Sequence, residues 1–114
     1  MSTQLFSAGI LDYSIGAQRF LAVANTTGQA LVQKHIQGDW GNFGSYQKTQ
    51  AGQNNRKMSG QEPSQAQLNK LAIDNNRGRV WSEYEIGEQK IWLITENIGA
   101  KGKATRLVLP RECN

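Results

Sequence analysis

The chain has few of the residues on which several classes of protein depend. It holds one cysteine and one histidine in 114 residues, so a disulfide within the chain and a cysteine-based metal cluster are both excluded. We expect no cofactor and no metal. No stretch reaches the roughly 18 apolar residues of a membrane span, and the first residues lack the charged start and apolar core of a signal peptide. These absences predict a soluble, cytoplasmic protein.

Acidic residues are also fewer than basic ones, nine against thirteen, which gives a formal net charge of +4. This excess favours solubility and a weak attraction to polyanions, but it does not establish nucleic-acid binding. The length indicates one domain covering residues 1–114. The sequence does not indicate an oligomeric state.

Hydrophobic residues make up 38% of the chain, a low share for a globular domain. Much of the shortfall lies in residues 42–62, which are rich in Gln, Asn, Gly and Ser. A stretch of this length and composition predicts a flexible polar insert. The alternative is an adaptable basic loop that contacts a partner through Lys48, Arg56 and Lys57.

Patterns in the first two thirds predict short elements. Residues 5–13 favour a strand or an extended arm, and residues 16–25 a short helix. Thr26 and Gln29 form a capping-box pattern at the start of a second helix, which Gly38 is placed to end. A further capping box, Ser64 with Gln67, begins a helix whose apolar stripe is Leu68, Leu71 and Ala72.

The last third has the clearest pattern. "RVWSEYEIGEQKIWLITE" predicts two strands joined by a type II′ turn at Gly87 and Glu88, with Glu85 opposite Lys90. "TRLVLP" predicts a third strand. The expected fold class is therefore α+β, with a three- or four-stranded antiparallel sheet, a C-terminal β-meander, packed against two or three short helices. Residues 5–13 would supply the fourth strand.

The stretch "HIQGDWGNFG" contains the only histidine. A catalytic interpretation makes His35 a base oriented by Asp39, but no nucleophile has an identifiable place beside it. A structural interpretation explains more residues: His35 favours the negative end of its helix, Gly38 supplies a turn, Asp39 bonds nearby amides, and Trp40 anchors the chain on the core. We interpret these four residues as a structural motif and predict no catalytic residue.

Basic residues flank two of the predicted strands. We expect these residues to form one positive face that contacts a polyanion or an acidic protein surface; ordinary solvated charge is the alternative. Aromatic residues on a sheet can stack bases, but the spacing of Trp81 and Trp92 among Ile and Val favours the core. The residues of the predicted basic face are Arg77, Arg79, Lys101, Lys103 and Arg106.

Five motifs follow one another in a particular order: "KHIQGDWG", a helix with Asn69 and Ala72, "GRVWSEY", "KIWLITE" and "ATRLVLP". This order resembles a group of small bacterial plasmid- and mobile-element-associated proteins. The resemblance implies the setting of a mobile genetic element and supplies no activity. We therefore predict a non-enzymatic accessory protein that binds nucleic acid, or a host nucleic-acid-handling or defence complex, through the basic face.

The order of the elements also suggests an alternative, a small RNA-cleaving toxin of a toxin–antitoxin pair. Such an enzyme would hold and polarise a phosphodiester with basic side chains and move protons with a histidine or a carboxylate. The residues for these roles would be Arg79, Arg106, Lys101 and Lys103, with His35 or Glu96 for the protons.

Overall fold

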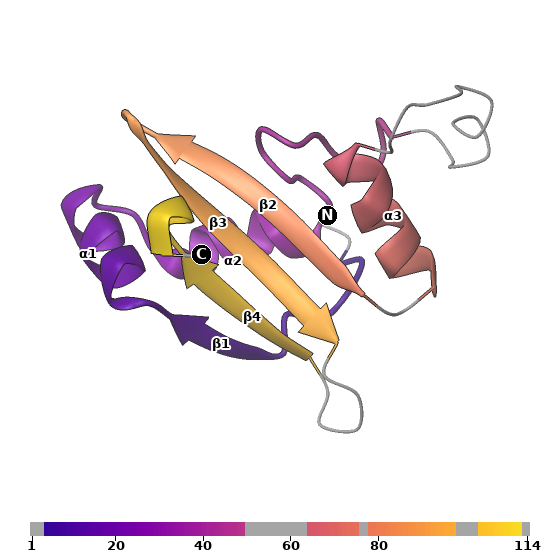
Figure 1. Cartoon of the computed structure of the whole chain (residues 1–114), viewed down its shortest axis with the longest axis horizontal. Helices are drawn as coiled ribbons and strands as arrows, with labels where there is room; N and C mark the ends of the chain where they lie inside the picture. Colours follow the sequence, from indigo (N-terminus) through magenta and orange to yellow (C-terminus); the bar gives the residue numbers. More distant parts are fainter. Residues whose placement is uncertain (1–3, 50–63, 76–77, 98–102, 113–114) are drawn as a thin grey trace.

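The computed structural model describes residues 4–49, 64–75, 78–97 and 103–112. These residues form an α+β fold with three α-helices and a four-stranded mixed sheet (Figure 1). The predicted fold class is thus confirmed. No helix in these ranges is long and apolar enough to cross a membrane. The elements, in chain order, are β1 (Ile10–Tyr13), α1 (Ile15–Val23), α2 (Gly28–Ile36), α3 (Gln65–Asn75), β2 (Arg79–Ile86), β3 (Gln89–Asn97), β4 (Lys103–Val108) and the 3-10 helix η3 (Pro110–Glu112).

The strands lie in the order β1-β4-β3-β2. Strands β2, β3 and β4 form the predicted antiparallel meander, and β1 pairs with β4 in parallel. The N-terminal segment therefore supplies the fourth strand, and its direction makes the sheet mixed rather than wholly antiparallel. A parallel pair needs a long connection, and here the chain between β1 and β4 contains every α-helix of the described residues.

The β2–β3 hairpin has the predicted register, with Glu85 opposite Lys90 and Trp81 opposite Ile94. Gly87 has φ 64°, whereas Glu88 is not among the non-glycine residues with positive φ. A positive φ at the first central position alone is the signature of a type II′ turn. Local turn chemistry therefore sets the register of the two longest strands.

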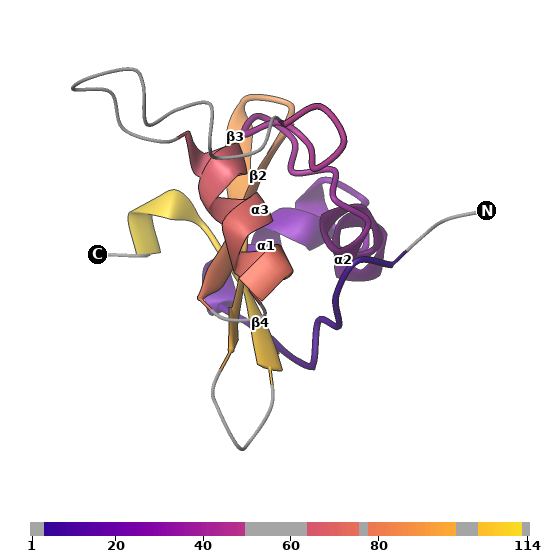
Figure 2. The ribbon, with the colours of Figure 1, turned by 90° about the vertical axis from the view of Figure 1, so that its right-hand side faces the viewer.

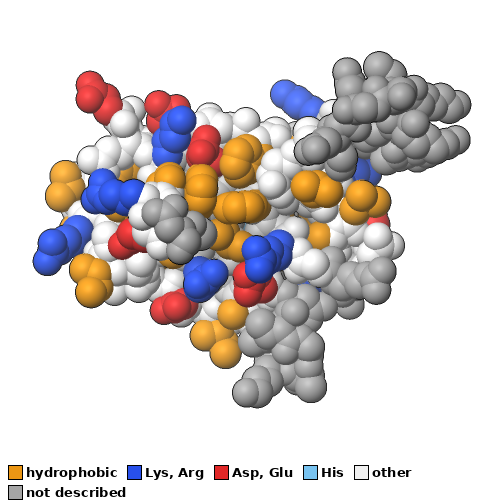
Figure 3. All heavy atoms as spheres, in the orientation of Figure 1, with side chains coloured by type: hydrophobic (Ala, Val, Ile, Leu, Met, Phe, Trp, Pro, Cys, Tyr) orange, Lys and Arg blue, Asp and Glu red, His pale blue; other side chains and the backbone are white. Residues whose placement is uncertain are grey.

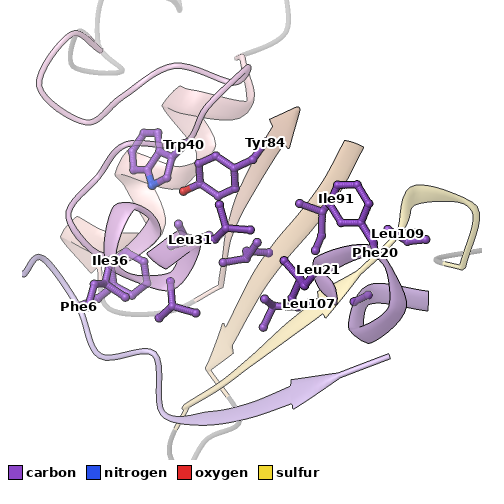
Figure 4. Close-up of a cluster of buried hydrophobic side chains, with 14 of the residues drawn as sticks. Phe6, Phe20, Leu21, Leu31, Ile36, Trp40, Tyr84, Ile91, Leu107 and Leu109 are labelled. Carbon is purple, nitrogen blue, oxygen red and sulfur yellow. The ribbon is translucent and has the colours of Figure 1, made fainter. Parts of the chain in front are cut away.

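Side chains alternate between the two faces of the sheet, and one face is covered by the core (Figure 4). Helices α1 and α2 pack their buried side chains against this covered face, and Trp40 closes the core with 0% of its surface exposed. Burial of this apolar surface is the main stabilising contribution to the fold. The members of this core cluster include Phe6, Phe20, Leu21, Leu31, Ile36, Trp40, Tyr84, Ile91, Leu93, Leu107 and Leu109.

Two helix starts show how caps select the boundaries. Thr27, not Thr26, caps α2: the Thr27 hydroxyl accepts a hydrogen bond from the Ala30 amide at 3.2 Å. The prediction was wrong by one residue because the Thr26 amide donates to the Leu21 carbonyl and belongs to the end of α1. The capping box of α3 is confirmed by its two reciprocal hydrogen bonds, of 2.8 and 3.2 Å, between residues 64 and 67.

The predicted apolar stripe of α3 is wrong for its two leucines, whereas Ala72 packs against the core. Leu68 and Leu71 are 44% and 43% exposed, whereas Ala66 and Asn69 are buried. The helix lies beside the edge strand β2 (Figure 1) and contacts it through the Asn69 side chain, so its leucines turn away from the core.

The predicted insert at residues 42–62 begins too early. Phe43 and Tyr46 pack against the core, and the Tyr46 hydroxyl donates a hydrogen bond to Asp74 at 2.9 Å. The Lys70 ammonium lies 3.6 Å from the centroid of the Tyr46 ring, a favourable cation–π geometry. Residues 42–49 are thus part of the packed domain, while residues 50–62 lie outside the described ranges.

Candidate functional site

His35 lies in the last turn of α2 with 0% of its surface exposed. Its Nδ1 is 2.6 Å from the Ser82 Oγ, and its Nε2 is 2.8 Å from the Thr95 Oγ1. Thr95 Oγ1 is in turn 2.6 Å from Thr105 Oγ1, and the Thr105 hydroxyl donates to the Ala8 carbonyl at 2.7 Å. A single chain of hydrogen bonds therefore joins α2, three strands and the N-terminal segment.

The last acceptor of this hydrogen-bond network fixes the donor and the acceptor of each bond in it. The Ala8 carbonyl only accepts, so the Thr105 oxygen must accept from Thr95, and the Thr95 oxygen must accept from the imidazole. The proton of His35 then lies on Nε2, and Nδ1 accepts from the serine hydroxyl. Burial lowers the pKa of His35 to about 3, so the ring stays neutral. With no exposed surface, His35 has no contact with an external substrate, and its role is to hold the elements together.

The other residues of the motif lie in the turn that follows α2. Gly38 has φ 91°, and a Cβ there would lie 2.7 Å from Leu5 Cδ1, so both the backbone and the space require glycine. The Asp39 carboxylate accepts from the Gly41 amide at 3.2 Å rather than from His35. The Asp39 carbonyl accepts from the Tyr84 hydroxyl at 2.5 Å. Asp39 therefore shapes its own loop and does not orient His35.

The outer edge of β2 is closed by two different groups. The Asn69 side chain accepts from the Trp81 amide at 2.9 Å and donates to the Trp81 carbonyl at 2.8 Å. The Glu83 amide donates to the Trp40 carbonyl at 3.2 Å, and the Glu83 carbonyl accepts from the Asn42 amide at 2.8 Å. These bonds leave little of this edge free to pair with another strand. Sequence analysis missed Asn69; the only signal was an amide at a buried helix position.

The second face of the sheet carries the candidate site, which we call the open face. At its centre the rings of Trp81 and Trp92 meet edge to face, with centroids 5.0 Å apart. Both tryptophans are half-buried and lie outside the core cluster, so the prediction that they belong to the core is wrong. Ile94 and Val108 lie beneath them on the same face.

No α-helix of the described residues lies over this face: α2 is on the far side of the strands, and η3 reaches only one end (Figure 2). The space-filling view shows hydrophobic side chains at its centre with charged ones around them (Figure 3). A hollow of about 420 Å³ between α3 and β2 extends the apolar area, and its lining includes Leu68, Leu71 and Trp81.

Charged groups around the tryptophans are paired with one another. A Glu96 oxygen lies 3.0 Å from Arg79 Nε and 3.9 Å from Arg106 Nη2, with the arginine side chains 64% and 48% exposed. Glu83 accepts from the Trp92 indole at 2.8 Å and from the Asn42 amide group at 3.1 Å. Partial burial acts to raise the pKa of Glu83, but these two hydrogen bonds and the charge of Lys90 lower it overall.

The predicted basic face is only partly assembled. The register places Arg79 and Arg106 on the open face, but it points Lys103 to the other face, where its ammonium is 5.9 Å from the centroid of the Phe6 ring. Lys48 lies in the loop after α2 and belongs to no strand. Arg77, Lys101, Arg56 and Lys57 lie outside the described ranges.

Strand alternation gives the open face more acids than bases. Its described strand positions carry three basic and four acidic side chains, a net charge of −1, so this face is mixed rather than positive. In the same part of the chain no three His, Cys, Asp or Glu side chains gather as metal ligands. The seven charged residues are Arg79, Lys90 and Arg106, and Asp12, Glu83, Glu85 and Glu96.

Comparison with protein-family models, with curated proteins and with solved structures found no match for this chain. The resemblance to mobile-element proteins therefore stays a prediction. Function has to be argued from the geometry and chemistry of the open face alone.

Proposed function

We propose that the chain is a non-enzymatic protein that binds a protein partner on its open face, as an accessory factor of a mobile genetic element. The observation that carries this proposal is the pair of partly buried tryptophans, Trp81 and Trp92, on a sheet face that no described α-helix covers. The pair continues into the exposed Leu68 and Leu71 of α3. Tryptophan and arginine dominate the binding energy of protein interfaces, and contiguous exposed apolar area marks such interfaces.

The charge pattern favours a protein over a nucleic acid. Nucleic-acid affinity comes largely from cations that displace counterions from phosphates, and the described open face has a net charge of −1. The Glu83 carboxylate is bonded to the Trp92 indole, so a base stacked there would bring its phosphate near a negative charge. An apolar centre with a rim of mixed charges is the common anatomy of a protein interface.

The geometry also favours binding over RNA cleavage. A cleaving enzyme needs a proton-transfer group within hydrogen-bond reach of the bound phosphate. His35 is enclosed on the covered face, and Glu96 is engaged by Arg79 and Arg106. Neither group is arranged to move a proton for a substrate on the open face.

The test compares matched surface variants. Leu71→Asp places a charge in the open face, and Val23→Asp places the same charge on α1, where Val23 is 87% exposed. A partner captured from host extract and then purified is titrated against each. We expect Leu71→Asp and Trp92→Ala to weaken binding by about 30-fold or more, the effect of losing a hot spot of about 2 kcal/mol, and Val23→Asp to leave it unchanged.

A parallel titration uses labelled single-stranded RNA, single-stranded DNA and duplex DNA across a salt series. Steep salt-dependent binding that is lost in an Arg79→Ala/Arg106→Ala variant would contradict the proposal in favour of a nucleic-acid partner. RNA cleavage by purified protein that is lost in Glu96→Gln would contradict the non-enzymatic part.

A further inference from the structure

A second hollow, of about 720 Å³, lies at the other end of the molecule from α3. Its walls are α1, the turn of the β2–β3 hairpin, and residues 109–112 after β4. Ile15, Phe20, Val23, Ile86 and Leu109 make the lining largely apolar. Ile15 and Val23 are 70% and 87% exposed, an unusual state for large apolar side chains next to a concave surface. We call this hollow the α1 groove.

Two arginines of the α1 groove form no ion pair with a described residue, although the charge of Arg111 acts on the neighbouring Glu112 and helps to lower its pKa. Arg19 and Arg111 both line it, and within the described ranges the ion pairs are formed by Arg79 and Arg106 with Glu96. Arg19 lies between Ile15 and Val23 at four-residue spacing, so the three share one face of α1.

Two acids also line the groove, and one of them holds the start of α1 through hydrogen bonds. The Glu112 carboxylate accepts from the Ser14 hydroxyl at 2.5 Å, the Gly16 amide at 3.0 Å and the Leu109 amide at 2.8 Å. A Cβ at residue 16 would lie 2.5 Å from this carboxylate, so glycine is what allows it to cap α1. Glu88, in the hairpin turn, is the other acid of the lining. The groove thus combines apolar side chains with two guanidinium groups, neither of them in an ion pair with a described residue, and with two carboxylates.

We propose that the α1 groove binds a small amphiphilic anion, with its apolar body against Phe20, Val23 and Leu109 and its head group between Arg19 and Arg111. The volume lies within the roughly 300–1,000 Å³ of small-ligand sites, which are mostly apolar with a few placed polar groups. Arginine binds carboxylates and phosphates with paired N–H donors. A fatty carboxylate and a lipid phosphate share the required chemistry.

The test is calorimetric titration of the full chain with decanoate, decyl phosphate and the neutral decyl maltoside, each below its micelle concentration. We expect one or both anions to bind, and their affinity to fall at least about tenfold in an Arg19→Gln/Arg111→Gln variant, the loss of one charge-assisted contact. Stronger binding of decanoate would indicate a fatty carboxylate as the ligand, and stronger binding of decyl phosphate a lipid phosphate. Lys34→Gln/Lys48→Gln, at two exposed positions outside the groove, removes the same charge and should bind as the unaltered chain does.

Three results would overturn this proposal: no binding of either anion at low salt, equal affinity for the neutral maltoside, or unchanged affinity in the double arginine variant. Val23→Asp, which stays exposed and spares the fold, should abolish anion binding as well. Leu71→Asp should leave it intact. Because the two surfaces share no residue, failure here leaves the proposed protein interface untouched, and the reverse also holds.

Discussion

Replacing His35 with glutamine is expected to flatten the dependence of folding stability on pH. His35 is the only histidine of the chain, so no other side chain has an ordinary pKa between those of the carboxylates and the N-terminus. Its imidazole accepts from Ser82 and donates to Thr95 in a fully buried site. Glutamine keeps one donor and one acceptor but has no proton to gain.

The size of the effect follows from the pKa change on folding. The pKa of His35 falls from 6.5 to about 3 because burial disfavours the charged ring. As the pH drops below 6.5, the unfolded chain binds a proton that the folded chain refuses. Stability is therefore complete above that pH and is lost toward pH 3, by up to about 1.4 kcal/mol per pH unit. Between about pH 7 and pH 5 the loss is about 2 kcal/mol.

Urea unfolding at several pH values measures this loss directly. With a denaturant slope of about 2 kcal/mol per molar, the midpoint of the unaltered chain should fall by about 1 M over that pH range. Glu83 and Glu112 also have lowered pKa values. The stability that they contribute is lost only as the pH falls below their ordinary pKa of 4.5, outside this pH range. A midpoint that falls equally in His35→Gln, or an imidazole NMR signal of the folded protein that titrates near pH 6.5, would refute this account of the buried network.

Two further predictions concern the edge and the turns of the sheet. Asn69→Leu should destabilise the fold by about 3 kcal/mol, because the amide and carbonyl of Trp81 lose their hydrogen-bond partners. The control Leu68→Ala, at an exposed position, should cost less than about 0.5 kcal/mol. Equal losses of stability in urea unfolding would contradict the role of Asn69 at the edge of β2. Gly41→Ala should lower the stability several times more than Gly87→Ala, although both glycines have φ 64°. A Cβ at Gly41 would lie 2.1 Å from the Glu83 carbonyl oxygen, whereas a Cβ at Gly87 has nothing within 4 Å. Gly87→Ala therefore carries only the backbone penalty of about 1 kcal/mol. Similar melting temperatures for the two glycine variants would show that the loop at Gly41 moves to make room for the Cβ, and would contradict this prediction.

Features set by neighbouring residues were predictable from the sequence. The hairpin register follows from the type II′ turn at Gly87, and the start of α3 follows from the capping box of Ser64 and Gln67. Gly38 ends α2 with a positive φ. In each case the signal and the structure it specifies lie within a few residues of one another.

Features that depend on distant residues were not predictable. The partners of His35 are 47 and 60 residues away, and no local pattern identifies them. A strand that is apolar on both faces indicates cover on both sides, but α3 lies at the edge of β2 instead, where Asn69 holds it. The sequence pattern therefore predicts that both tryptophans belong to the core, and it does not indicate an open face.

The most direct test of the proposed interface is site-specific photo-crosslinking in host cells. A photoreactive phenylalanine analogue is placed at Leu71, in the open face, or at Gln33, on the exposed surface of α2, and the products are analysed by mass spectrometry. We predict a discrete protein adduct from position 71 that is absent from position 33 and disappears in a Trp92→Ala background. Crosslinks mainly to nucleic acid, or the same products from both positions, would contradict the open face as a protein-binding site.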